Sequence, residues 1–66
     1  MRIVLNGSEE EVEAGATVGR VVDRVVRDRE RVAVERNRAI VRRTLWDETP
    51  IEPGDVIEVV TLVGGG

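Results

Sequence analysis

The chain has 66 residues, which is enough for one small domain and too few for two hydrophobic cores. It contains no Cys and no His, so disulfides, common metal ligands and the usual nucleophile–base pairs are all missing. The net charge is −3 with both signs mixed along the chain, and no apolar run is long enough to span a membrane. We therefore expect a cytoplasmic protein that binds neither nucleic acid, which needs a clustered basic face, nor membranes.

The chain opens with a predicted β-hairpin. In "MRIVLN" apolar and polar residues alternate, which predicts a strand with Ile3 and Leu5 on one face. Asn6-Gly7 follows and is a strong signal for a two-residue turn. A weaker strand, "EEEVEA", comes next with Val12 among glutamates. Its consecutive glutamates are typical of a solvated strand edge, because charges there block edge-to-edge pairing.

A helix is predicted after Gly15, where the valines change to helical spacing. The valines that share this helix face are Val18, Val21, Val22, Val25 and Val26. Thr17 is a suitable N-cap. Valine is a moderate helix former, and Gly19 costs about 1 kcal/mol relative to alanine. We therefore expect the helix to form only with its valine face packed on a sheet.

Two more strands and a loop are predicted next. "RVAVERN" alternates again, with Val32 and Val34 facing one way, and Asn37-Arg38 indicates a turn into a short strand around Ile40. "TLWDETPIEPGD" predicts a loop with one helical turn. Because tryptophan is heavily buried on average, we expect Trp46 to close the open end of the core.

The final strand, "VIEVVTLV", is apolar enough to be central in the sheet. The resulting order is ββαββ, a loop and β, which predicts an α+β fold with a mixed sheet of about five strands packed on one helix. We expect the first and last strands to lie side by side at the centre. This is the ubiquitin-like β-grasp arrangement, with the domain over residues 1–63 and a flexible glycine tail over 64–66.

The tail is the candidate functional site. The chain lacks His, Cys, Lys and Tyr, so it has almost none of the side chains that perform acid–base or nucleophilic catalysis. Gly64 and Gly65 have no Cβ atoms and could pass through a narrow channel in a partner. The carboxylate of Gly66 could become reactive as an acyl-adenylate. The chain is therefore predicted to be a substrate and carrier, not an enzyme.

Strand alternation also predicts a docking surface for partners. In the last strand Ile57 and Val59 face the helix, which leaves Val60 and Leu62 exposed on the other face beside the tail. Exposed apolar side chains next to a functional terminus are candidates for docking. Val4, on the neighbouring strand, could join them.

Several stretches point to one family: "MRIVLNG", "AGATV" before the predicted helix, "VAVERNRAIVRR" with "LW" soon after, and "GDVIEVVTLVGGG". Over its whole length the chain resembles the sulfur carrier proteins of thiamine biosynthesis, the ThiS family of ubiquitin-like proteins. "ERNRAIV" and "IEVVTLVGGG" are the stretches that point to the thiamine branch, since a terminal di-glycine is shared with other carriers.

The resemblance implies a cycle performed by partner enzymes. A ubiquitin-activating-type adenylating enzyme would use ATP and Mg²⁺ to form an acyl-adenylate at Gly66. A persulfide, made by a cysteine desulfurase or another donor, would displace AMP and leave a thiocarboxylate. Thiazole synthase would then take the sulfur into the thiazole ring of thiamine. The carrier itself would hold no cofactor and no metal.

Other functions fit the same sequence. The chain could carry sulfur for molybdopterin synthesis or tRNA thiolation, or it could be a protein modifier joined to target lysines. A β-grasp interaction module with an incidental glycine tail is a further alternative. An interaction module would function without the last two glycines, whereas a carrier would not. Among carriers, only the deletion of a thiamine carrier should be rescued by supplied thiazole or thiamine.

Overall fold

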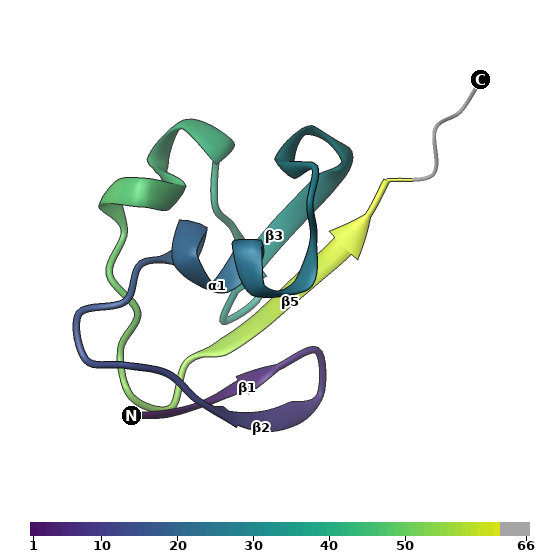
Figure 1. Cartoon of the computed structure of the whole chain (residues 1–66). Coiled ribbons are helices and arrows are strands. Elements are labelled where there is room, and N and C mark those ends of the chain that lie inside the picture. The colour runs from purple at the N-terminus through teal and green to yellow at the C-terminus, as the bar shows by residue number, and fades with distance from the viewer. Residues whose placement is uncertain (63–66) are drawn as a thin grey trace.

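The computed structural model describes residues 1–62, which form one mixed sheet packed on one α-helix (Figure 1). In chain order the elements are β1 (Arg2–Leu5), β2 (Ser8–Glu11), α1 (Val18–Val25), the 3-10 helix η1 (Arg29–Arg31), β3 (Val32–Arg36), β4 (Ala39–Ile40), the 3-10 helix η2 (Arg43–Glu48) and β5 (Val56–Thr61). The strand order in the sheet is β2-β1-β5-β3-β4. The predicted α+β class and element order are confirmed, whereas the predicted domain end at residue 63 and the tail over 64–66 lie outside the described residues.

The hairpin forms because the turn residues accept left-handed backbone angles. Asn6 and Gly7 have φ values of 50° and 83°, which are the angles of a two-residue primed turn. Leu5 and Ser8 are paired across it, so the register is fixed at the turn. Ile3 and Leu5 are buried, as the alternation predicted.

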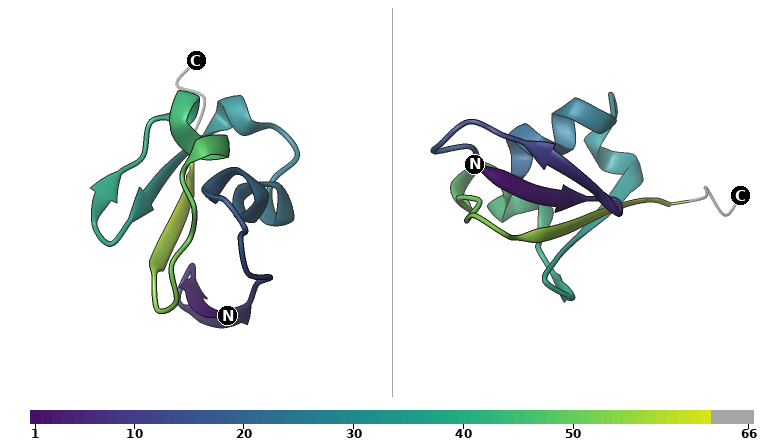
Figure 2. Two further views of the ribbon diagram at one scale, coloured as in Figure 1. Left: turned by 90° about the vertical axis from the view of Figure 1, so that its left-hand side faces the viewer. Right: turned by 90° about the horizontal axis from the view of Figure 1, so that it is seen from below.

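The first and last strands form the centre of the sheet. β1 and β5 are parallel, with Val4 opposite Val56 and Leu5 opposite Ile57, and β3 pairs with β5 on its other side. This confirms the predicted adjacency of the first and last strands. Figure 2 shows the helical segments on one side of this sheet. No helix of residues 1–62 covers the opposite face, and none of these helices is both long and apolar enough to cross a bilayer.

α1 begins as predicted and ends earlier than predicted. The Thr17 hydroxyl accepts a hydrogen bond from the backbone N–H of Arg20 at 3.2 Å, and Val18, Val21 and Val22 are fully buried. Val25, however, is 44% exposed, so its predicted place on the buried face is wrong. The reason is that the helix ends at this residue and the backbone becomes extended at Val26.

The core lies between α1 and the sheet and is closed at one end by η2. Trp46 on η2 is 1% exposed, and its indole N–H donates to the carbonyl of Val41 at 2.8 Å. The prediction that this tryptophan closes the core is confirmed. The core residues are Ile3, Leu5, Val12, Ala16, Val18, Val21, Val22, Val32, Val34, Trp46, Ile51 and Ile57.

An arginine joins three surface elements above this core. The Arg29 guanidinium donates to both carboxylate oxygens of Asp23 and of Asp47, at 2.8–2.9 Å. It lies 5.9 Å from the centre of the Trp46 ring, within cation–π range. Hydrogen bonds from Arg29 lower the pKa of each aspartate, and the two carboxylates raise the pKa of the arginine. The cluster connects α1, η1 and η2.

Candidate functional site

β5 carries the chain toward the predicted modification site. Beyond its last residue, Thr61, the N–H of Leu62 still donates to the carbonyl of Arg31 at 2.7 Å. The chain is therefore attached to the sheet up to Leu62, four residues before Gly66 in the sequence. Gly64, Gly65 and Gly66, the predicted access and modification residues, lie outside the described residues.

The structure places the three predicted docking residues on one face of the sheet. Val60 is 49% exposed and Leu62 is 51% exposed, and both lie on the face turned away from α1. Val4 is half-buried on the same face, directly opposite Val56 of β5. The exposure of these side chains agrees with the alternation of inward and outward residues predicted for the last strand. Their role in docking stays a prediction.

Two exposed apolar residues of this face were missed by the sequence analysis. Ile40 is 68% exposed. It pairs with Glu35, which in turn pairs with Glu58, and residues directly opposite each other share a face of the sheet. Ile40 therefore lies on the same face as Val60. Val56 is also exposed. The signal for Val56 was present in the alternation of the last strand, whereas the place of Ile40 depends on the register of β4. The outer apolar face, as we call it, consists of Val4, Ile40, Val56, Val60 and Leu62.

The outer apolar face also contains an unneutralised pair of acidic residues. Glu35 on β3 lies directly opposite Glu58 on β5. No ion pair among residues 1–62 involves either carboxylate. Like charges directly opposite each other in a sheet destabilise it. A partner that presented a basic side chain between apolar ones would relieve this repulsion on docking.

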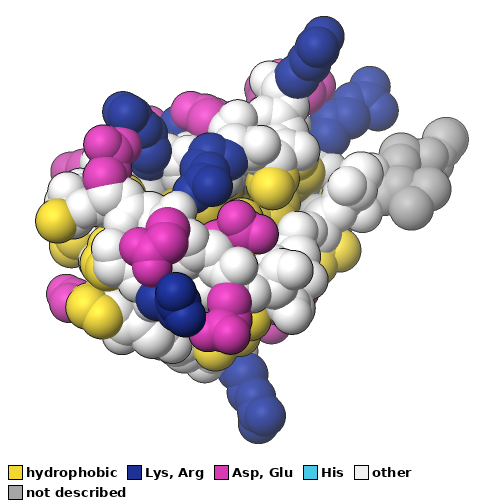
Figure 3. Space-filling model, turned by 60° about the horizontal axis from the view of Figure 1, so that its bottom comes forward, with side chains coloured by type: hydrophobic (Ala, Val, Ile, Leu, Met, Phe, Trp, Pro, Cys, Tyr) yellow, Lys and Arg dark blue, Asp and Glu magenta, His cyan; other side chains and the backbone are white. Residues whose placement is uncertain are grey.

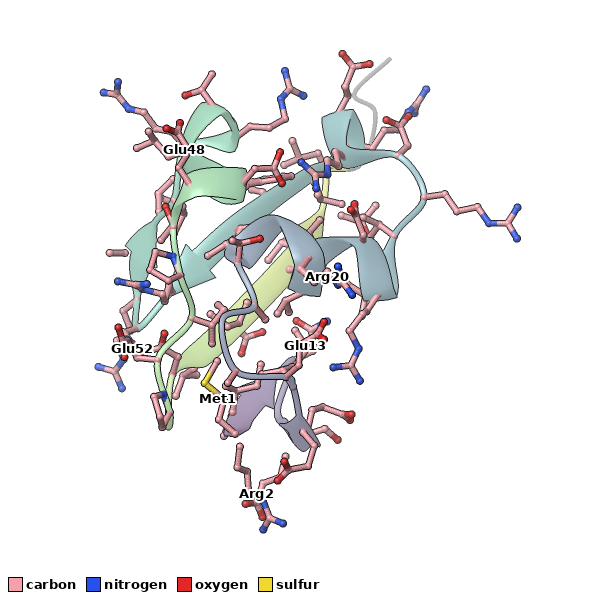
Figure 4. The ribbon with its side chains drawn as sticks, turned by 60° about the vertical axis from the view of Figure 1, so that its left-hand side comes forward. Met1, Arg2, Glu13, Arg20, Glu48 and Glu52 are labelled. Atoms are coloured by element: carbon pink, nitrogen blue, oxygen red, sulfur yellow. The ribbon has the colours of Figure 1, made fainter. Side chains whose placement is uncertain are left out.

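The remaining surface is dominated by mixed charges. On the face drawn in Figure 3, basic and acidic side chains are interspersed, with exposed apolar side chains between them. Figure 4 shows Arg20 and Glu13 at the entrance to α1, where they form an ion pair of 2.8 Å. Both side chains are well exposed, so the pair contributes little to stability. Within residues 1–62 no group of three or more acidic side chains is placed to hold a metal ion.

The arrangement of the sheet defines the class of fold. A mixed sheet with parallel first and last strands at its centre, wrapped on one helix, is the ubiquitin-like β-grasp fold. The chain matches the model of the ThiS family over residues 2–66. It therefore belongs to the ThiS family.

Solved structures and curated proteins agree with this assignment. A crystal structure of the thiamine biosynthesis protein ThiS from Geobacter metallireducens superimposes with a TM-score of 0.84 at 29% identity, covering all of both chains. A thiazole synthase from Paramagnetospirillum magneticum is 36% identical over all 66 residues, and one from Magnetococcus marinus is 41% identical. The chain spans only 20% of the length of each of these two relatives.

Proposed function

We propose that the protein is a sulfur carrier for the thiazole moiety of thiamine and works in the cytoplasm through a thiocarboxylate at Gly66. The observation that carries the proposal is the outer apolar face, whose residues Val60 and Leu62 lie just ahead of the three glycines. Membership of the ThiS family supports the carrier role. The two thiazole synthases that contain a region similar to this whole chain favour thiazole synthase as the acceptor of the sulfur.

The proposed reaction is carried out by partner enzymes on one functional group. A carboxylate oxygen of Gly66 attacks the α-phosphorus of ATP, Mg²⁺ balances the phosphate charge, and pyrophosphate leaves. A persulfide sulfur, supplied by a cysteine desulfurase or another donor, then attacks the carbonyl carbon and AMP leaves. A second thiol cleaves the resulting acyl disulfide and releases the thiocarboxylate. Thiazole synthase is the proposed consumer of that sulfur.

Intact-mass measurement tests this proposal. The chain is incubated with the purified adenylating enzyme, ATP, Mg²⁺, a persulfide donor and a thiol, and the C-terminal peptide is fragmented. We expect one oxygen at Gly66 to be replaced by sulfur, and no change in a variant that lacks Gly65 and Gly66. If Gly66 keeps a plain carboxylate with every component present, the carrier proposal is wrong.

A pair of glutamate substitutions tests the outer apolar face. Leu62→Glu should raise the KM for adenylation by about tenfold or more, because it places a charge where docking removes water. Ala14→Glu is the control, since Ala14 is exposed in the loop before α1 and lines a hollow with Glu13 and Arg20, neither of which belongs to the outer apolar face. Equal KM values for the two variants would remove the outer apolar face from the docking surface.

A further inference from the structure

One edge of β5 is only partly covered by its neighbour. β1 pairs with β5 as far as Leu5 and Ile57, whereas β5 continues to Thr61. At the point where β1 ends in the hairpin turn, the side-chain oxygen of Asn6 accepts the N–H of Val59 at 2.8 Å. A side chain thus takes the place of the missing strand for one hydrogen bond.

The hydrogen bonds of β5 show which backbone groups are left at this edge. The backbone N–H and C=O groups of the even-numbered residues point toward β3. The carbonyl of Val56 accepts from the N–H of Asn37, and the N–H of Leu62 donates to the carbonyl of Arg31, just ahead of β3. The backbone groups of the odd-numbered residues point toward β1, since the carbonyl of Ile57 accepts from the N–H of Asn6.

It follows that three further groups point to the β1 side beyond the Asn6 contact. They are the carbonyl of Val59 and the N–H and carbonyl of Thr61. No hydrogen bond within residues 1–62 uses them, and Thr61 is exposed. Such a row of unpaired N–H and C=O groups is a template for another extended chain.

We propose that this open edge of β5 receives an extended segment of the adenylating enzyme, which adds as a short strand beside Val59 and Thr61. The inference rests on the proposed function and names the way in which that enzyme holds the carrier. The edge ends five residues before Gly66 in the sequence. A strand bound there fixes the direction in which the last residues leave the domain.

The surroundings of the edge specify the side chains of the incoming segment. A hollow of about 360 Å³ lies between the hairpin and the end of α1, lined by Asn6 and by Val25, which is 44% exposed. The opposite face beside the edge presents Val60. Because successive side chains of a strand point to opposite faces, the segment needs an apolar residue toward Val60 and a polar one toward the hollow, which Ser8, Glu10 and Arg24 also line.

A second copy of this chain is a poorer occupant. Two copies joined through so short an edge would bury far less area than a stable specific interface needs. The adenylating enzyme can combine the edge with contacts to the outer apolar face and to the glycines.

Backbone methylation tests the edge without changing any side chain. At this length the chain can be made by chemical synthesis with an N-methyl group at Thr61, which removes the donor and blocks a neighbouring strand. We expect the KM for adenylation to rise by about tenfold or more. The control is N-methylation of Glu9, whose N–H points away from β1 at the outer edge of β2. This variant should be adenylated with an unchanged KM.

Hydrogen exchange on the unmodified protein gives an independent measurement in case the methylated chain folds poorly. Adding the adenylating enzyme should slow exchange of the Thr61 amide by about tenfold or more, while the Glu9 amide is unaffected. Unchanged exchange at Thr61 in the complex, or an unchanged KM for the methylated chain, overturns the inference and leaves the carrier function standing. If Thr61 becomes protected with rising concentration of the chain alone, a second copy is the occupant and the inference is wrong. If the unmodified chain is not adenylated at all, the proposed function and the inference fail together.

Discussion

Gly19 lies inside α1, where glycine normally destabilises a helix relative to alanine. The structure explains its presence by a close approach of η2. A Cβ at this position would overlap the carboxylate of Asp47 and lie 2.8 Å from Nη2 of Arg29. The missing side chain is what allows the arginine to bridge Asp23 and Asp47.

A double-mutant cycle tests this explanation of Gly19. Gly19→Ala alone should not give the gain of about 1 kcal/mol in unfolding free energy that helix propensity predicts, because it displaces Asp47. In an Asp47→Ala background, the same Gly19→Ala change should give part of that gain, because the Asp47 carboxylate is gone and only the end of the Arg29 side chain has to shift. Urea denaturation measures all four proteins, and equal effects of Gly19→Ala in both backgrounds would contradict the steric explanation.

At the residue scale the sequence predicted what depends on near neighbours. The hairpin turn follows from Asn6-Gly7 and the helix start from Thr17, because each side chain or backbone angle acts within a few residues. Contacts across the chain could not be read in this way. The bridge from Arg29 to Asp47 joins residues 18 positions apart and exists only once η2 is folded over α1.

At the scale of elements, α1 is stabilised by packing more than by its own residues. It has only eight residues and is rich in valine, so its buried face decides whether it forms. The periodicity identified that face correctly at Val18, Val21 and Val22 and wrongly at Val25. Periodicity shows which residues share a face and does not show where a helix ends.

Two valines of α1 give a matched test of this dependence. Val22→Ala should lower the unfolding free energy by about 2 kcal/mol, since Val22 is fully buried and the change removes methyl groups and leaves a cavity. Val25→Ala should change it by less than about 0.5 kcal/mol, because Val25 is nearly half exposed. Similar losses for both variants, measured by urea denaturation, would mean that Val25 is buried in solution.

The arginine bridge between α1, η1 and η2 predicts an acid dependence of stability. Arg29 lowers the pKa of Asp23 and of Asp47 below their ordinary value of 3.8. A lowered pKa in the folded state means that the stabilisation is present above pH 3.8 and is lost as the pH falls through the folded-state pKa values. Arg29→Gln should therefore lose less stability than the unmodified chain between about pH 4 and pH 2.

Urea denaturation at a series of pH values below neutrality measures this effect. The control is Arg27→Gln, which removes an exposed arginine that has no ion pair within residues 1–62 and should leave the acid dependence unchanged. If the unfolding free energies of Arg29→Gln and Arg27→Gln fall equally with falling pH, the arginine bridge is not the source of the acid dependence of stability.

At the scale of the whole molecule, the sheet has one face covered by helices and one exposed face, on which we propose that partners dock. α1 covers the inner face, and the outer apolar face is exposed with Glu35 and Glu58 opposed within it. Such an arrangement costs stability in the free protein and is useful only when a partner supplies a basic group.

Neutralising one acid of this pair should separate stability from function. Glu58→Gln should raise the unfolding free energy by a few tenths of a kcal/mol, because the repulsion is removed. It should also raise the KM for adenylation by about threefold to tenfold, because a basic residue of the enzyme loses its partner. Glu48→Gln, a change of the same charge at an exposed residue of η2 that has no ion pair within residues 1–62, serves as the control. A Glu58→Gln variant with unchanged KM would show that this acidic pair has no role in docking.

The parallel pairing of β1 with β5 has a consequence for the timing of docking. The two strands are separated by about fifty residues in the sequence, so this pairing is strongly non-local and its loop closure costs conformational entropy. Val4 and Val56 become neighbours only when this pairing has formed. A newly made or partly unfolded chain therefore does not present the complete outer apolar face. If partner enzymes dock there, as we propose, the topology limits docking to molecules that have finished folding.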